Sequence, residues 1–231
     1  MYSRIINGNE YTFGVSGKLI RNALVMYDHE TDSLWSQLLG ESVQGLLMGT
    51  RLEYLPAVMT TWENWRSMHP DTRAIQKGYV GAQDPYEGYY GGTVLGVIGV
   101  QNRDDRLGDK EFVIGVELDR ESAAYPFSVL NDEPVINDEI AGLPVVVAFD
   151  AEIGAGSVWE RTLADGRVLE FAELRGALMR DTETGTLWDG ITGQAVEGAL
   201  AGDTLSPVPK TLVFWFAWFD FHPDTRLYGF E

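Results

Sequence analysis

Residues 24–36 have the sequence LVMYDHETDSLWS, and residues 177–189 have the sequence ALMRDTETGTLWD. Each stretch places two short runs of strand-forming residues on either side of a polar, turn-forming segment, which predicts a β-hairpin. The turn opens with Asp in both stretches and closes on Asp32 or Gly185, which are residue types that tolerate positive φ. The same hairpin is therefore expected twice in the chain.

The similarity extends well beyond the hairpin. An offset of 153 residues aligns positions 24–73 with 177–226 without a gap, and 20 of the 50 aligned positions are identical. Both segments end in His-Pro-Asp-Thr-Arg, and residues 61–68 are expected to form a short helix that stops before Pro70. Because the period is much longer than the 20 to 50 residues of solenoid repeats, we interpret the pattern as a domain duplication.

The two copies differ in what precedes them. Strand-like runs at residues 112–117 and 143–149 lie before the second copy, and the first copy has no such counterpart. We expect a mainly β protein with a few short helices (α+β), built of two pseudo-repeated β-rich units. Residues 1–75 would be the C-terminal part of the first unit, residues 76–110 a Gly- and Tyr-rich connecting loop, and residues 111–231 the complete second unit. The first unit is thus expected to be incomplete at its N-terminus, and a fragment of a longer protein explains this better than loss of the opening strands.

Composition excludes several classes of function. Thirty-five acidic and 17 basic residues give a net charge of −18, which repels nucleic acids and anionic lipid surfaces. The absence of cysteine excludes disulfides, thiolate metal sites and cysteine nucleophiles. The apolar stretch at residues 212–219 is much shorter than the roughly 20 residues of a membrane span. We therefore expect no nucleic acid partner and no membrane insertion. A protein or small-molecule ligand is compatible with the composition, which does not identify it.

The repeated His-Pro-Asp-Thr-Arg motif supplies candidate ligand-binding residues. A histidine followed two residues later by a carboxylate is the arrangement of a general base with its orienting group, or of part of a metal site. The favoured alternative is structural, because such an Asp can accept backbone N–H groups in a turn and a histidine is stabilised at a helix C-terminus. The candidates are His69, Asp71, Arg73, His222, Asp224 and Arg226.

A second candidate is the tyrosine cluster Tyr86, Tyr89 and Tyr90 in the connecting loop. Amphipathic rings of this kind can form a platform for a sugar or a peptide, although packing of the loop against a domain is the favoured alternative. The alternating acids Asp28, Glu30 and Asp32 are similar to a calcium loop but lack its sixth-position Gly and twelfth-position Glu. No catalytic residue, metal ligand or cofactor is predicted.

The whole chain resembles a known family. The motifs GVSGKL at 14–19, LVMYD at 24–28, SLWSQ at 33–37 and GTRL at 49–52 are similar to those of the uncharacterised prokaryotic family called domain of unknown function 3179. Members of that family usually open with an Asn-Trp-His-Glu-like segment, followed by a strand that ends in Cys-Pro-x-Cys. Many are exported or lipid-anchored, so the resemblance implies an extracytoplasmic location.

This chain departs from the family pattern at the positions that could carry chemistry. Glu133 stands at the family's His position, and Asp150 and Ile153 stand at the two Cys positions. A histidine beside two thiols would form a metal or redox site, and the second unit lacks all three groups. We therefore expect a non-catalytic β-rich binding or scaffold module. The alternative is a fragment of a metal-dependent or redox enzyme whose active residues precede Met1, so the question of enzymatic activity stays open.

Overall fold

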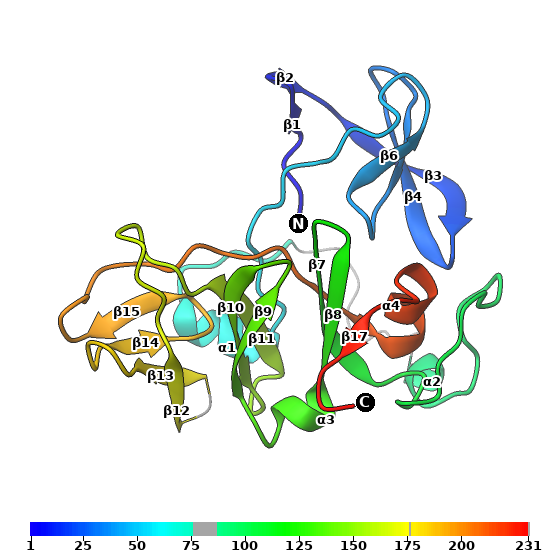
Figure 1. The fold of residues 1–231 in the computed structure, drawn as a ribbon. Helices are drawn as coiled ribbons and strands as arrows, with labels where there is room; N and C mark the ends of the chain where they lie inside the picture. Colours follow the sequence, from blue (N-terminus) through cyan, green and yellow to red (C-terminus); the bar gives the residue numbers. More distant parts are fainter. Residues whose placement is uncertain (76–86, 176, 231) are drawn as a thin grey trace.

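A computed structural model describes residues 1–75, 87–175 and 177–230 of the chain (Figure 1). Within these residues it contains seventeen strands, mostly short, and four short helices. The expectation of a mainly β fold with a few helices is therefore confirmed. None of the helices in the described ranges has the length and hydrophobicity of a membrane span.

The first 55 residues form a small β region that stands apart from the rest of the chain in Figure 1. It contains a two-stranded hairpin and a four-stranded antiparallel sheet in which neighbours in sequence are neighbours in space. The buried side chains of Ile6, Trp35 and Leu52 form its core. The strands are β1 (Ile5–Ile6), β2 (Asn9–Glu10), β3 (Phe13–Ile20), β4 (Ala23–Asp28), β5 (Leu34–Ser36) and β6 (Glu41–Gln44).

A second four-stranded antiparallel sheet has the same strand order. Its members are β12 (Phe171–Arg175), β13 (Leu178–Asp181), β14 (Leu187–Asp189) and β15 (Gln194–Glu197). In both sheets the strand register shifts at the same position, between Leu34 and Trp35 and between Leu187 and Trp188. The predicted hairpins are thus confirmed as β4–β5 and β13–β14, with positive φ at Asp32 and Gly185 as expected.

Strand β10 (Leu143–Asp150) lies at the centre of the larger part of the molecule. It pairs with β9 (Val135–Ile140) and β11 (Ala155–Glu160) in a three-stranded sheet. Because successive side chains of a strand point to opposite faces, Val145 and Val147 enter one hydrophobic core, whereas Val146 and Ala148 enter another. Burial on both faces explains why the sequence of this strand is a continuous apolar run.

The remaining sheet has the order β16-β7-β8-β17 and lies between the first 55 residues and the three-stranded sheet in Figure 1. It consists of β7 (Phe112–Leu118), β8 (Glu121–Pro126), β16 (Thr211–Phe214) and β17 (Arg226–Leu227), with the short helix α3 (Phe127–Leu130) after β8. The connecting segment contributes one further short helix, α2 (Glu87–Tyr90).

Helices α1 (Trp62–Met68) and α4 (Trp215–Phe221) occupy corresponding positions in the sequence, and α1 confirms the predicted helix. The side chain of Thr61 caps α1 by accepting the N–H of Asn64 at 3.3 Å. Each helix ends at a histidine whose N–H bonds to the carbonyl of the tryptophan four residues earlier. The C-terminal ends of the two helices therefore have the same local structure, whereas Phe214 at the start of α4 forms no side-chain cap.

The surroundings of the two helices differ. The α4 residues Trp215 and Trp218 are 0% and 2% exposed. Trp218 lies so close to Gly115 of β7 that a Cβ at this position would overlap the indole ring, so the approach requires glycine. The corresponding Trp62 of α1 is 50% exposed. Trp65 of α1 lines the same hollow as Val158 and Trp159 of β11, so α1 has different neighbours from α4.

Candidate ligand-binding site

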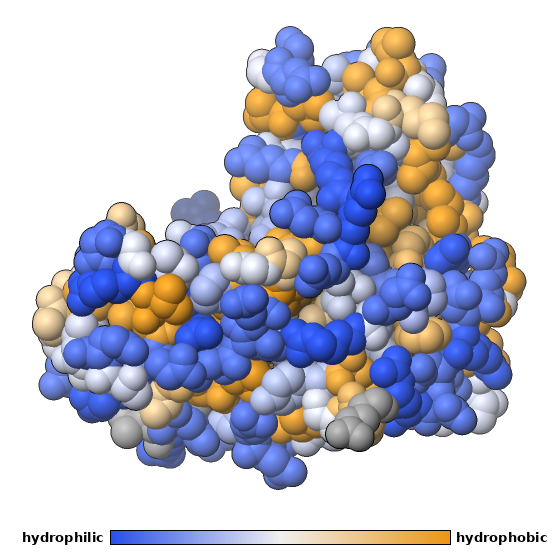
Figure 2. Space-filling view, viewed as in Figure 1, coloured by the Kyte–Doolittle hydropathy of each residue, from blue (hydrophilic) through white to orange (hydrophobic). Residues whose placement is uncertain are grey.

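Three hollows, of about 380, 300 and 300 Å³, lie where the first 55 residues meet the rest of the chain. All three are lined by Tyr54 and Lys210, which come from the corresponding segments that follow β6 and β15. The face of this junction that is visible in Figure 2 is mostly hydrophilic. The hollows therefore place two polar side chains at a shared wall between the two parts of the chain.

The hollow of about 380 Å³ has mostly apolar walls. Val58 and Trp65 line it from one side, and Trp159, Ile191 and Val208 line it from the other. The last three are buried, with exposed fractions of 7%, 6% and 4%. Its volume of about 380 Å³ lies within the range of roughly 300 to 1,000 Å³ found for small-molecule sites. The cavity thus has the size and the apolar lining that a small organic ligand requires.

Lys210 is the charged group in this wall. It follows Pro209 and directly precedes β16, and its Nζ donates a hydrogen bond to the carbonyl oxygen of Ala57 at 2.9 Å. Burial lowers the pKa of Lys210 to about 8, because removal from water disfavours the ammonium form. No carboxylate in the described part of the chain forms a salt bridge with Lys210.

Tyr54 supplies a neutral hydrogen-bonding group beside this lysine. Burial raises the pKa of the Tyr54 phenol, so the hydroxyl keeps its proton at neutral pH. The ring lies 6.4 Å from the ring of Tyr2 in an edge-to-face arrangement. The Tyr2 hydroxyl in turn donates to the carbonyl of Leu38 at 3.2 Å. These contacts hold Tyr54 in the wall between the hollows.

The two predicted histidines both lie at these hollows. His69 lines the hollow of about 380 Å³, and its ring centroid is 4.2 Å from that of Trp65. His222 lines the second hollow together with Glu117, and its ring centroid is 4.0 Å from that of Trp218. Burial lowers the pKa of His222. The structure therefore brings the two histidines to neighbouring hollows, each beside the tryptophan that precedes it by one helical turn.

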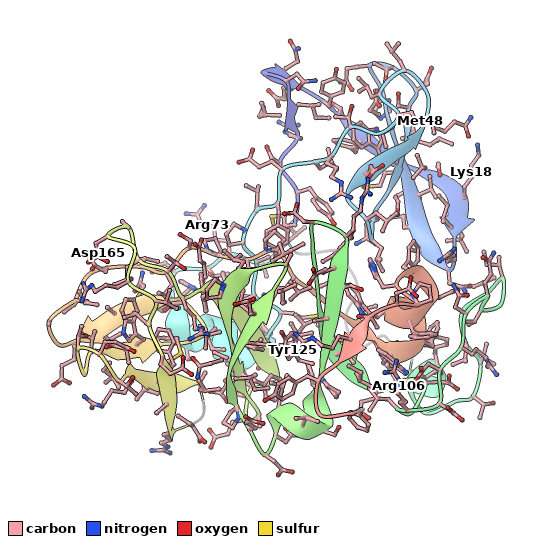
Figure 3. The ribbon with its side chains drawn as sticks, in the orientation of Figure 1. Lys18, Met48, Arg73, Arg106, Tyr125 and Asp165 are labelled. Atoms are coloured by element: carbon pink, nitrogen blue, oxygen red, sulfur yellow. The ribbon has the colours of Figure 1, made fainter. Side chains whose placement is uncertain are left out.

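The charged residues of the same motifs lie elsewhere. Asp71 and Arg73 are exposed. Asp224 and Arg226 line a separate hollow of about 260 Å³. The Arg226 guanidinium donates to the carboxylate of Asp138 at 2.7 Å, and this carboxylate also accepts the hydroxyl of Tyr125, which is labelled in Figure 3. The histidine, aspartate and arginine of the second motif therefore do not line the same hollow.

The threonine of each motif has a structural contact. Thr72 accepts the indole N–H of Trp65 at 2.9 Å, and Thr225 accepts that of Trp218 at 3.0 Å. Each contact ties the turn after the helix to a tryptophan side chain of that helix. This pairing was not predicted from the sequence, although both residues are identical between the two aligned segments.

Of the predicted tyrosine platform, Tyr86 lies outside the described residues. The rings of Tyr89 and Tyr90 lie 6.4 and 6.1 Å from that of Phe214. The Lys110 ammonium lies 3.9 Å from the centre of the Tyr89 ring, and it donates to the backbone carbonyls of Tyr89 and Gly92. Tyr90 remains 53% exposed. The two tyrosines thus pack against the end of β16.

Glu133, Asp150 and Ile153 lie near one end of the β9–β10 pair, because the N–H of Phe149 donates to the carbonyl of Pro134 at 2.8 Å. Glu133 accepts the hydroxyl of Tyr228 at 3.2 Å. Asp150 accepts the N–H groups of Glu152 and Ile153 in the turn before β11. Across the described ranges, no three His, Cys, Asp or Glu side chains are grouped closely enough to hold a metal ion.

Comparison with known proteins gives one match. The model of a family described as "Protein of unknown function (DUF3179)" covers residues 1–225. The chain belongs to this family. No curated protein and no solved structure matches it. Because membership of DUF3179 specifies no activity, the function of this DUF3179 chain has to be argued from its site.

Lys210 and Tyr54 were not predicted as site residues. Two features of the sequence point to Lys210. It is one of only four lysines in the chain, and it stands between PVP and TLVF in a long apolar segment. It also replaces Ala57 directly after a proline that both copies share, Pro56 and Pro209. A charged residue introduced next to an otherwise preserved position is a signal that a comparison of the two copies can detect.

Proposed function

We propose that this chain is a binding module whose cavity at Lys210 takes a small organic anion with an apolar body. One observation carries the proposal: a partly buried ammonium group in an apolar wall has no carboxylate partner among the described residues. A cation removed from water is unfavourable unless it is paired. A bound carboxylate, sulfonate or phosphate would supply that pairing through a charge-assisted hydrogen bond.

The apolar part of the ligand would occupy the rest of the cavity. The rings of Trp65 and Trp159 and the side chains of Ile191 and Val208 offer a surface for an aromatic or aliphatic group. Burial of such a group stabilises a complex by about 25 cal/mol for each Å² of apolar surface removed from water. The cavity therefore favours amphipathic anions over inorganic ones, which would bury no apolar surface.

We also infer that the chain contains one structural unit twice and that the cavity lies at the junction of the two units. The equivalent sheets β3–β6 and β12–β15, with their equal register shifts, support this inference. The hydrogen bond from Lys210 joins it to Ala57, which is the corresponding position in the first unit. A ligand at Lys210 would therefore contact both units.

The test uses 8-anilinonaphthalene-1-sulfonate, a fluorescent probe that combines an aromatic body with one sulfonate. We expect saturable binding to the wild type and a loss of about tenfold or more in affinity for Lys210→Met, because hydrogen bonds to charged groups contribute roughly 1.5 to 3 kcal/mol. The matched control is Lys18→Met, because Lys18 is exposed at the outer edge of the first sheet (Figure 3).

The control variant should bind the probe like the wild type, and near-ultraviolet circular dichroism should show native packing in both variants. Equal binding by Lys210→Met and the wild type would overturn the proposal, as would the absence of any saturable binding to the wild type.

A further inference from the structure

We propose that Lys210 forms a reversible imine with small aldehydes or ketones that enter the cavity. The inference rests on the proposed binding function and adds the chemical class of one group of ligands. Three observations carry it: the position of the Lys210 amine in the cavity wall, its lack of a carboxylate partner in the described part of the chain, and a neutral phenol in the same wall.

The position of the amine is fixed by its single hydrogen bond. Nζ of Lys210 donates to the carbonyl oxygen of Ala57 at 2.9 Å. A neutral amine has two N–H groups and one lone pair, so this bond uses one N–H and leaves the lone pair and the other N–H available. Because Lys210 lines the cavity of about 380 Å³, a ligand in that cavity can approach the lone pair.

The environment favours the reactive form of the amine. A lysine is a nucleophile only when it is neutral, and desolvation in an apolar pocket is one of the ways in which proteins produce that form. The pKa of about 8 leaves a substantially larger neutral fraction at pH 7 than an ordinary lysine with a pKa of about 10.4 has. An adjacent carboxylate would oppose this by stabilising the ammonium form, and no such carboxylate pairs with Lys210 in the described residues.

The reaction needs no oxidant or reductant. The lone pair of Nζ attacks the carbonyl carbon, and a C–N bond forms while the electrons of the C=O π bond move to oxygen. Proton transfer from nitrogen to oxygen gives a carbinolamine. The hydroxyl then takes up a second proton and leaves as water while the nitrogen lone pair forms the C=N bond, and loss of the remaining N–H proton gives the neutral imine. The phenol of Tyr54, which lines the same wall and keeps its proton, can donate a hydrogen bond to the oxygen during these steps.

The other described lysines lie in different environments. Lys18 is exposed, so its amine lies in water and not in an apolar wall. The Lys110 amine packs on the ring of Tyr89 and donates to two backbone carbonyls, so these contacts engage it away from the cavity at Lys210. Reaction with a carbonyl compound at neutral pH is therefore expected to favour Lys210 over the other described lysines.

The experiment treats the folded full chain with benzaldehyde and sodium cyanoborohydride at pH 7, which converts any imine to a stable benzylamine. Peptide mass spectrometry then locates the modification. We expect Lys210 to be labelled at least about tenfold faster than Lys18, because burial lowers the pKa of Lys210 to about 8. Prior addition of 8-anilinonaphthalene-1-sulfonate should slow labelling of Lys210 and leave labelling of Lys18 unchanged. Tyr54→Phe should slow labelling of Lys210 while the probe still binds.

Lys210→Arg separates this inference from the proposed function. Arginine keeps the positive charge and forms no stable imine under these conditions, so this variant should still bind the fluorescent probe and should lose the labelling at position 210. Labelling of Lys210 no faster than that of Lys18, in a wild-type protein that binds the probe, would overturn the imine inference and leave the binding function standing. Failure of the wild type to bind the probe would overturn the proposed function itself.

Discussion

The indole N–H of Trp188 donates to Oδ2 of Asp181 at 2.9 Å, and both residues are fully buried. The same carboxylate accepts the backbone N–H of Thr184 at 2.6 Å and the hydroxyl of Thr184 at 2.9 Å. One aspartate thus connects the turn of the β13–β14 hairpin to the largest buried side chain of that sheet. Trp35 and Asp28 have the same relationship at 2.8 Å in the first sheet.

The first prediction concerns this contact. Asp181→Ala should lower the free energy of unfolding by about 2 to 3 kcal/mol, because it leaves the indole N–H and the turn N–H without their charged acceptor. Urea unfolding followed by tryptophan fluorescence measures the change. The control is Glu173→Ala on the exposed side of β12, which should change the value by less than about 0.5 kcal/mol. Equal effects of the two substitutions would contradict the role of Asp181.

The second prediction concerns acid stability. Burial by itself would raise the pKa of Asp181, but the hydrogen bonds from Trp188 and Thr184 outweigh it and lower the pKa. A carboxyl group with a lowered folded-state pKa stabilises the fold at pH values above its unfolded pKa of about 3.9, and this contribution is lost as the pH falls through the folded value.

The wild type should therefore exceed Asp181→Asn in stability most strongly above about pH 5, and the difference should narrow toward pH 2. Urea unfolding of both proteins across this range measures the difference. A difference that stays constant from pH 7 to pH 2 would show that the ionised Asp181 carboxylate contributes nothing.

The third prediction compares the two helices. Trp215→Ala should destabilise the protein by about 3 to 5 kcal/mol, because it removes a fully buried indole from the core beneath α4. The corresponding Trp62→Ala should cost less than about 1 kcal/mol, because Trp62 is 50% exposed. Thermal unfolding of the two variants under one set of conditions provides the comparison. Similar losses for both would mean that α1 is buried as deeply as α4.

The fourth prediction concerns the pH dependence that Lys210 introduces. Its folded-state pKa of about 8 lies below the unfolded value of about 10.4, so between these values the unfolded chain binds more protons than the folded one. The contribution of Lys210 to the free energy of unfolding should therefore rise with pH in this window. The other titratable or charged groups that line the same hollows are the α-amino group of Met1 and the side chains of Tyr2, Arg51, Tyr54, His69, Glu117, Asp119 and His222.

Lys210→Met removes this group while it keeps most of the volume of the side chain. The variant should be more stable than the wild type at pH 7, and its advantage should disappear by about pH 10.5. Chemical unfolding at several pH values provides the measurement. A wild type that is more stable than Lys210→Met at pH 7 would indicate that the charged Lys210 stabilises the fold.

Local features of the fold could be predicted from the sequence. The Asp that opens each turn, together with Asp32 and Gly185 at its end, specifies the hairpins through short-range hydrogen bonds and backbone preference. The helix at residues 61–68 was predictable because Thr61 is a good cap and Pro70 prevents continuation. Turn and cap preferences depend on residues a few positions apart, so they can be recognised in the sequence.

The arrangement of these elements could not be predicted in the same way. Trp62 and Trp215 occupy corresponding positions in the two aligned segments, yet Trp215 is buried and Trp62 is 50% exposed. Trp215 is buried because it packs in a core with β7, which lies about 100 residues earlier in the chain. The candidate site likewise depends on contacts between residues that are far apart in the sequence. Lys210 becomes distinctive only when residues 54–58 are placed against it, and no local motif encodes that contact. The histidines His69 and His222 were found because their motif is repeated, whereas Lys210 interrupts the repeat.

The pKa of Lys210, with and without a bound anion, is the most direct test of the proposed binding site. Nuclear magnetic resonance of protein labelled with ¹³C and ¹⁵N in its four lysines can follow each side chain through a pH titration, with Lys210→Arg assigning the signal. The account predicts that Lys210 titrates near pH 8, and that 8-anilinonaphthalene-1-sulfonate raises its pKa because the bound sulfonate stabilises the ammonium form. A Lys210 signal that titrates near pH 10.4, with no response to the probe, would contradict it.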